Sequence, residues 1–238
     1  MYKRQILSFT KTFSDLWLAQ ASYTLSYLRG NWDGLFRPQT DQLDPGTNSD
    51  FDLPSLTINR YGPLDGDRRH ELKVFGARDI PVTQQHHINL GLSYRARSGG
   101  PTSYLGAHAV YGNDEVFILP RGSGPRLPWQ HTVDTHVGYT FLRTEKQSFA
   151  VTADIFNLFN IRTLRRVSER YTNRPVEPIT GVDPDAARIN SRTINPDLVQ
   201  ASDGEEPGFS QDDVSRSYGA PTSYLEPISL RFGVRATF

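Results

Sequence analysis

The segment HINLGLSYR, residues 87–95, alternates apolar and polar side chains without a break. Its apolar parity carries Ile88, Leu90, Leu92 and Tyr94, and its polar parity carries His87, Asn89, Gly91, Ser93 and Arg95. Successive side chains of a β-strand point to opposite faces, so this pattern has the period of a strand and not of a helix. The segment is therefore predicted to be a strand with one apolar and one polar face.

Six further segments extend this pattern along the chain. The alternation is clear in residues 16–29, 131–142, 147–157 and 228–238, and it is weaker in residues 2–13 and 70–80. In the last of these, Leu72 and Val74 occupy one parity while Phe75 and Ala77 occupy the other, which predicts a bulge or a two-sided strand. The chain is thus predicted to be all-β, with seven strands in all.

The connections between these strands fall into two length classes, which alternate. Short turns are expected near residues 14–15, 81–85 and 143–146, and long loops run through residues 30–69, 98–130 and 161–226. Compact soluble domains rarely carry several long loops, whereas a transmembrane barrel has short periplasmic turns and long extracellular loops. The favoured fold is therefore a segment of an antiparallel transmembrane β-barrel. The alternative is a soluble β-sandwich binding module, in which the apolar faces would form a core.

The aromatic residues of the apolar parity agree with the barrel. Several of them lie near strand ends, where the interfacial girdles of a membrane barrel fall. They are Trp17, Tyr27, Tyr94, Tyr139, Phe141 and Phe238.

Composition excludes several other classes of protein. The 238 residues contain 26 Lys and Arg against 26 Asp and Glu, so no net charge attracts a nucleic-acid backbone, and no nucleic-acid partner is expected. The absence of cysteine excludes disulfides, zinc–thiolate sites and thiol nucleophiles. No run of about 18 apolar residues is present to form a membrane-spanning helix. The mean hydropathy of -0.52 fits alternating strands as well as a soluble chain.

The odd number of strands has a consequence for chain organisation. Bacterial single-chain barrels have an even number of strands, which places both ends on one side of the membrane. With seven strands and a last strand that ends on the short-turn side, Met1 would lie on the long-loop side. Residues 1–13 also lack the apolar core of a signal peptide. We therefore expect residues 1–238 to be the C-terminal portion of a larger barrel and not to close a barrel alone.

Candidate catalytic and metal chemistry is sparse. Asp134 and His136 share the polar face of one strand, where a carboxylate near an imidazole could do acid–base work, but such polar pairs are expected on any polar strand face. His86 and His87 are adjacent and point to opposite faces, which disfavours a metal site. The segment Gly122-Ser-Gly124 lacks the lysine of a phosphate-binding loop. The sequence predicts no enzyme and no catalytic, cofactor or metal site.

Two groups of charged residues leave a binding role open. On the polar strand faces, Arg95, Arg231 and Arg235 accompany Asp134 and Asp154, and we expect them to pair, with a ligand path as the alternative. Acidic residues of the last long loop could bind calcium through their oxygens, although solvated charge is the favoured interpretation. These acidic residues are Asp183, Asp185, Asp203, Glu205, Glu206, Asp212 and Asp213.

Four stretches resemble one known family. The final run YGAPTSYLEPISLRFGVRATF, residues 218–238, resembles the last loop and closing strand of TonB-dependent outer-membrane receptors, and looks closest to the Oar-like group, whose N-terminus carries a carboxypeptidase-regulatory-like domain. The segment AVTADIFNLFN, residues 150–160, is similar to the penultimate-strand signature of that family. Residues 67–73, DRRHELK, resemble its DRxHxxK strand start, and FILPRGSGPRLPW, residues 117–129, resembles the loop before the next strand.

The resemblance implies an outer-membrane receptor of a Gram-negative bacterium. Such receptors have a barrel of 22 strands around an N-terminal plug and take up scarce or bulky ligands with energy from TonB. The seven strands would be the last seven, and TonB would act only through the missing N-terminal part. A small complete outer-membrane pore or hydrolase stays open as an alternative.

The resemblance also implies partners for the wall of the barrel. These are outer-membrane lipid and the barrel-assembly machinery, which would read Phe232, Val234, Ala236 and Phe238 as its signal. The ligand is not identified by the sequence, and no cofactor is implied.

Overall fold

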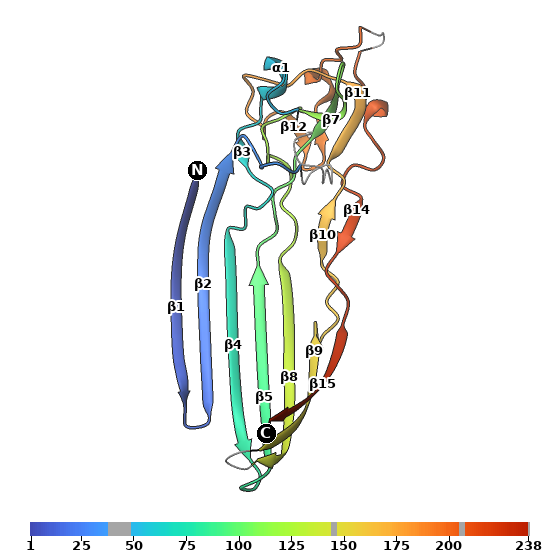
Figure 1. Cartoon of the computed structure of the whole chain (residues 1–238). Coiled ribbons are helices and arrows are strands. Elements are labelled where there is room, and N and C mark those ends of the chain that lie inside the picture. The colour runs from blue at the N-terminus through green and yellow to red at the C-terminus, as the bar shows by residue number, and fades with distance from the viewer. Residues whose placement is uncertain (38–48, 144–146, 205–207, 238) are drawn as a thin grey trace.

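The computed structural model describes residues 1–37, 49–143, 147–204 and 208–237. Seven long strands form the lower part of the molecule in Figure 1, and the long connections gather at the end where β1 begins. The long strands are β1 (Tyr2–Ser14), β2 (Trp17–Gly30), β4 (His70–Pro81), β5 (His87–Arg97), β8 (Gln130–Arg143), β9 (Ser148–Phe156) and β15 (Ser229–Thr237). All seven predicted strands are confirmed, and their bounds differ from the predicted ones by a few residues.

The long strands form one antiparallel sheet in the order β1-β2-β4-β5-β8-β9-β15. Each strand therefore pairs with its neighbours among the long strands, as in an up-and-down meander. The sheet is open within the described residues, because β1 pairs only with β2 at one edge and β15 only with β9 at the other. The chain starts near the long connections and β15 ends near the short turns, as the sequence predicts.

Of the two alternatives predicted for residues 70–80, a bulge or a two-sided strand, the structure shows the two-sided strand. The strand β4 pairs without a register shift with β2 from His70 to Arg78, and with β5 from Glu71 to Pro81. Its two apolar parities are instead the two faces of a regular strand. A register shift does occur in β8, between Thr140 and Leu142. The residue between them is Phe141, which the sequence placed in a regular alternation.

Pairing sorts the side chains of the sheet into an apolar outer face and a polar inner face. In β5 and β8, Leu90 is opposite Val137 on the outer face, while Asn89 is opposite Gly138 on the inner face. The outer face stays exposed rather than forming a core: Leu92 is 53% and Phe232 is 77% accessible to solvent. A sandwich would bury this face, and in the described residues it remains uncovered.

Aromatic and histidine rings form a row across the outer face at each end of the sheet. Near the long connections, five rings stack with nearly parallel planes, and neighbouring centroids lie 5.8–6.2 Å apart. Two tyrosine–histidine hydrogen bonds of 2.7 and 2.9 Å fix this row. It consists of Tyr23, His70, Trp129, His131 and Tyr94. Near the short turns, a second row contains His86, Tyr139, Phe141 and Phe149.

The long connections fold together into a unit that we call the cap, formed by the described residues of 31–69, 98–129 and 161–226. The prediction of seven strands in all is wrong here, because the cap contains short strands that no alternation marks. Its main sheet has the order β11-β6-β7. The elements of the cap are α1 (Pro54–Thr57), β3 (Gly62–Pro63), β6 (Leu105–His108), β7 (Gly112–Phe117), β10 (Leu164–Val167), β11 (Arg170–Pro175), β12 (Arg188–Asn190), β13 (Thr193–Ile194), η1 (Pro196–Leu198), η2 (Gln211–Asp213) and β14 (Pro221–Tyr224). None of these helices is long and apolar enough to cross a membrane, in the part of the chain that the structure describes.

The hydrophobic core of the molecule lies in the cap and not on the long sheet. Three tyrosines form its centre: the Tyr171 ring meets those of Tyr104 and Tyr218 edge-on, with centroids 5.6 and 5.1 Å away. Aliphatic residues from all parts of the last two long connections surround them. The buried residues are Tyr104, Val116, Ile118, Leu119, Tyr171, Val176, Ile179, Ala187, Ile194 and Val199. The long loops therefore form a packed unit with a core of its own.

Candidate functional site

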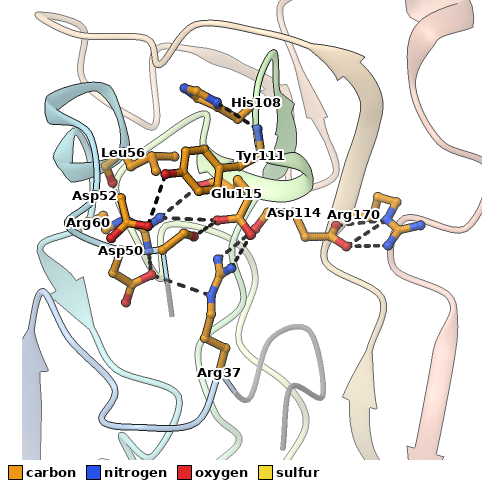
Figure 2. A network of polar contacts seen from close by, with 11 residues as sticks. Arg37, Asp50, Asp52, Leu56, Arg60, His108, Tyr111, Asp114, Glu115 and Arg170 are labelled. Atoms are coloured by element: carbon orange, nitrogen blue, oxygen red, sulfur yellow. Dashed lines mark hydrogen bonds and ion pairs between the residues drawn. The ribbon is translucent and has the colours of Figure 1, made fainter. Parts of the chain in front are cut away.

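A buried network of charges holds the first long connection against β7 (Figure 2). The guanidinium of Arg60, 1% exposed, forms an ion pair with Asp50 and donates to the Glu115 carbonyl oxygen at 3.0 Å. Arg37 donates to the Glu115 carboxylate at 2.5 Å and lies 3.6 Å from Asp50. Burial is the largest influence on Arg60 and lowers its pKa to about 10. The network stabilises the interior of the cap, because charges buried away from water need partners of opposite charge.

A second ion pair joins β7 to β11 across the sheet of the cap. The Arg170 guanidinium donates from Nε to both carboxylate oxygens of Asp114, each at 3.0 Å, and also from Nη2. This fork-like geometry is the strong form of an arginine–carboxylate contact. Figure 2 shows the pair at the far side of the network from Arg60. It holds Arg170 at the edge of the cavity described next.

A cavity of about 310 Å³ lies where the cap meets the inner face of the long sheet. Five arginines and three acidic residues reach it from four segments: the residues just before β4, the end of β5, β7 and the β10–β11 region. The lining residues are Asp65, Arg68, Arg97, Asp114, Leu127, Arg165, Arg166, Val167, Ser168, Glu169, Arg170, Ser217 and Thr222. Its volume is at the lower end of the range for small-molecule pockets. It is the candidate functional site of this chain.

The segment DRRHELK anchors one wall of this cavity. Asp67, 2% exposed, accepts a hydrogen bond from the Leu28 amide at 2.8 Å and an ion pair from Arg126. Arg68 donates to the backbone carbonyls of Asp65 and Asp67 at 2.7 and 3.1 Å. Burial is the main cause that lowers the Arg68 pKa, and the nearby Arg126 and Arg165 lower it further. The first residues of the segment therefore join the long sheet to the cap.

Glu169 is the buried carboxyl group of the cavity. Its Oε2 accepts a hydrogen bond from the Ser103 amide at 2.8 Å. Burial raises its pKa to about 8, with a further contribution from the negative charges of Asp65 and Asp33. At pH 7 the group is thus mostly protonated, and it removes little of the positive charge that the arginines place in the cavity.

Replacing Glu169 by glutamine should make the protein more stable at alkaline pH. The folded protein holds the Glu169 proton more tightly than the unfolded chain does, so folding of the wild type loses stability as pH rises from about 4.5 to about 8. Glutamine keeps the acceptor for the Ser103 amide and does not ionise. Thermal unfolding of both proteins should give similar midpoints at pH 4 and a higher midpoint for Glu169→Gln at pH 8.5. Midpoint curves that stay parallel across this range would contradict the burial of an ionising group.

Some of the charged residues predicted on the inner face form ion pairs. His136 Nδ1 lies 2.6 Å from Asp154 Oδ1, and Arg231 donates to the other oxygen of Asp154 at 2.9 Å. Asp134, the partner considered for His136, instead accepts a hydrogen bond from the Asn157 amide at 2.8 Å. Asp134 and His136 therefore have separate partners, which agrees with the rejection of an acid–base pair. The expected pairing of arginine with carboxylate is confirmed at Arg231.

The other two inner-face arginines have separate positions. Arg95 forms an ion pair with Glu71 of β4, which the sequence did not select. Arg235 lines a polar hollow of the inner face together with Asp79 and His87. His87 contacts Asp79 at 3.1 Å, while the neighbouring His86 bonds Tyr139 on the outer face. The two histidines thus point to opposite faces, as predicted.

The acidic residues of the last connection are only partly the solvated charges that were favoured. Asp203 and Asp213 both contact the Arg174 guanidinium, at 2.7 and 3.4 Å, and Asp185 pairs with Arg188. Asp183 accepts the Asp185 amide at 2.9 Å in a local turn. Glu205 and Glu206 lie outside the described residues, and within those residues no group of acidic or histidine side chains could hold a metal ion.

The residues suggested as an assembly signal share the outer face of β15. Phe232 and Val234 are opposite Ala153 and Val151 of β9, and both are exposed. Ala236 follows on the same face, and Phe238 lies outside the described residues. The role of β15 in assembly stays a prediction.

Gly122, in the segment considered and rejected as a nucleotide loop, has a positive φ of 70° and forms a turn.

The arginine cavity itself was missed at the level of sequence. One signal was present: the stretch RTLRRVSER, residues 162–170, carries four arginines within nine positions of a long loop. The other arginines, Arg68 and Arg97, lie in segments far away in the sequence and close on the cavity only through folding.

Comparison with known proteins supports the resemblance seen in the sequence. No protein-family model matches the chain, and no solved structure matches it. The chain is 43% identical, over all of its 238 residues, to the TonB-dependent transporter Oar of Myxococcus xanthus. It spans 22% of the length of that protein. The resemblance to TonB-dependent receptors of the Oar type is thereby confirmed, and the chain is, over its whole length, a homologue of part of a TonB-dependent transporter.

Proposed function

We propose that this chain forms part of the wall and the external loops of a TonB-dependent transporter in the outer membrane of a Gram-negative bacterium. The observation that carries the proposal is the sheet itself: its outer face is apolar and exposed, its inner face is polar, and its long connections lie at one end. A membrane barrel needs this combination, because lipid contacts one face and a polar interior the other. The identity to a transporter over the whole chain supports the same role.

The proposed place of the sheet is the last third of a barrel of 22 strands. Strands of 9–14 residues are long enough to cross a bilayer at the tilt of a barrel. The unpaired edges of β1 and β15 would be costly in lipid, so they require neighbouring strands from the same barrel. In this arrangement the two rows of aromatic and histidine side chains lie at the two membrane interfaces, where amphipathic aromatic side chains are favoured.

In the proposed mechanism the cap meets a ligand outside the cell and the inner face lines its path. Energy from TonB would act through a plug in an N-terminal part, and not through the residues described here. The exposed outer face of β15, with Phe232, Val234 and Ala236, would be read by the barrel-assembly machinery together with Phe238. No specific observation favours an enzyme: the relative is a transporter, and the His136–Asp154 pair is completed by Arg231 as a structural ion pair.

Substituting arginine on the two faces of one strand tests the membrane position. Leu92 lies at the middle of β5 on the outer face, and its neighbour Ser93 lies on the inner face opposite Asp134. Arginine at the bilayer midplane costs about 2–4 kcal/mol, whereas the polar inner face tolerates it. We expect Leu92→Arg in the full-length gene product to lower its outer-membrane level severalfold and Ser93→Arg to leave it near normal, measured by membrane fractionation and immunoblotting.

The pair of variants is matched in strand, depth and added side chain. Equal levels for both variants, or recovery of the unsubstituted protein in the soluble fraction, would refute the transmembrane role. A level that falls only for Ser93→Arg would mean that the two faces have been assigned the wrong way round.

A further inference from the structure

The cavity between cap and sheet holds three arginines that form no ion pair with the described residues. In the described part of the chain, no carboxylate lies within ion-pair distance of Arg68, Arg97 or Arg165, although all three line the cavity. Arg97 donates its Nε to the side-chain oxygen of Gln130, a neutral partner, at 2.6 Å. Arg68 bonds backbone carbonyls, and its buried Nε has no hydrogen-bond partner. Arg68 and Arg97 are partly buried, and a partly desolvated guanidinium without an ion-pair partner is costly, which favours a counter-charge from outside the protein.

The acidic residues of the cavity do not supply that counter-charge. Asp114 is held in a fork by Arg170, so its charge is already matched. Glu169 is mostly protonated at pH 7, because burial raises its pKa to about 8. Asp65 is the third acidic residue of the cavity lining, whereas three of the lining arginines have no carboxylate partner among the described residues. The cavity therefore keeps an excess of positive charge at neutral pH.

The donors around the cavity suit an oxyanion and not a single small ion. Guanidinium groups present planar pairs of N–H donors that match phosphate and carboxylate oxygens. Ser168, Ser217 and Thr222 also line the cavity. The cavity volume of about 310 Å³ is several times the roughly 30 Å³ that one water occupies in the liquid. The cavity therefore has room for a charged group together with the adjoining atoms of the ligand that carries it.

We propose that this cavity binds a multiply charged oxyanion, a phosphoryl group or a group of similar charge and size, between Arg68, Arg97 and Arg165. The group could belong to a soluble ligand or to a lipid headgroup, and its chemistry is the same in both cases. The inference rests on the proposed function in one respect only: the outer-membrane position of the cap would bring the ligand to the cavity from outside the cell. Binding to purified protein does not depend on transport, so the two proposals fail in different experiments.

The test measures phosphate binding by isothermal titration calorimetry, in which inorganic phosphate is titrated into the full-length protein in a zwitterionic detergent. Arg165 is exposed and makes no hydrogen bond to described residues, so Arg165→Gln removes charge with little effect on folding. The matched control is Arg162→Gln, which changes an exposed arginine of the same segment outside the cavity. We expect saturable binding to the wild type, at least about tenfold weaker binding to Arg165→Gln, and a change below twofold in the control. Sodium acetate, a singly charged oxyanion, should compete poorly.

Phosphorus carried through purification identifies the source of the oxyanion. If wild-type protein retains about one lipid phosphorus per chain and Arg165→Gln does not, the ligand is a lipid headgroup, and the proposal stands. If neither carries lipid phosphorus and phosphate titrates as expected, the ligand is soluble, and it also stands. If phosphate does not saturate and no lipid is retained, or if Arg162→Gln and Arg165→Gln weaken binding equally, the proposal is overturned.

Discussion

Replacing Asp50 by asparagine should destabilise the cap by about 3–5 kcal/mol, the cost of leaving a buried charge without its partner. Asparagine keeps the shape of the side chain and removes its charge. Arg60, with a side chain only 1% exposed, would then have no carboxylate closer than that of Glu115 at 4.0 Å. Arg37, 3.6 Å from Asp50, would also lose a counter-charge. Both guanidiniums would stay buried and positively charged.

The measurement is hydrogen–deuterium exchange of the full-length protein, read from peptides of the cap. A loss of about 4 kcal/mol corresponds to roughly a thousandfold faster opening of residues 54–60 and 112–119. The matched control is Asp52→Asn, since Asp52 is exposed and, among the described residues, its side chain accepts a surface hydrogen bond from Tyr111 at 3.2 Å. Surface changes of this kind stay within about 0.5 kcal/mol. Equal exchange in the two variants would show that the buried ion pair does not hold the cap.

Removing the ring of Tyr171 should destabilise the cap by a similar amount, about 3–5 kcal/mol, through a different mechanism. Tyr171 is fully buried, and its ring meets those of Tyr104 and Tyr218 edge-on. Alanine at this position leaves a cavity at the centre of the core, which a well-packed interior fills only in part. The hydroxyl has a role of its own, because it accepts the buried Ile194 amide at 3.0 Å.

Two substitutions at this position separate packing from hydrogen bonding. Tyr171→Phe keeps the ring and leaves the Ile194 amide without an acceptor, which costs about 1–3 kcal/mol. Tyr224→Ala, at a half-exposed tyrosine of β14, is the surface control. Limited proteolysis of the full-length protein should cut the cap fastest in Tyr171→Ala, more slowly in Tyr171→Phe, and at the wild-type rate in the control. A Tyr171→Ala protein as resistant as the control would refute a packed core in the cap.

The long sheet could be read from the sequence because each strand carries its own pattern. The alternation in residues 87–95 assigns Leu90 and Leu92 to one face before any partner strand is known, and the pairing of Leu90 with Val137 agrees. At β4 the same local rule left a bulge and a two-sided strand open, because apolar residues on both parities do not say which face is which. There the two neighbouring strands decided the register.

The cap could not be read in the same way, because its residues follow no period. Asn59 donates to the Ile179 carbonyl at 3.0 Å across 120 residues of chain, and it also binds the Phe117 and Ile118 carbonyls. Its neighbour Arg60 stacks over the Phe117 ring at 5.3 Å. In sequence these segments are loops with many Gly and Pro residues, which predict turns but not the contacts between them.

The sequence by itself determined seven strands, the two faces of their sheet and the end at which the long connections lie. The period of two is a property of the extended backbone and is present in each segment separately. Only the tertiary structure decided that the long connections form a packed cap and that Arg68, Arg97 and Arg165 line one cavity. These arginines come from three separate segments, and contacts across such distances depend on the packing of the whole cap against the sheet, which no local pattern encodes.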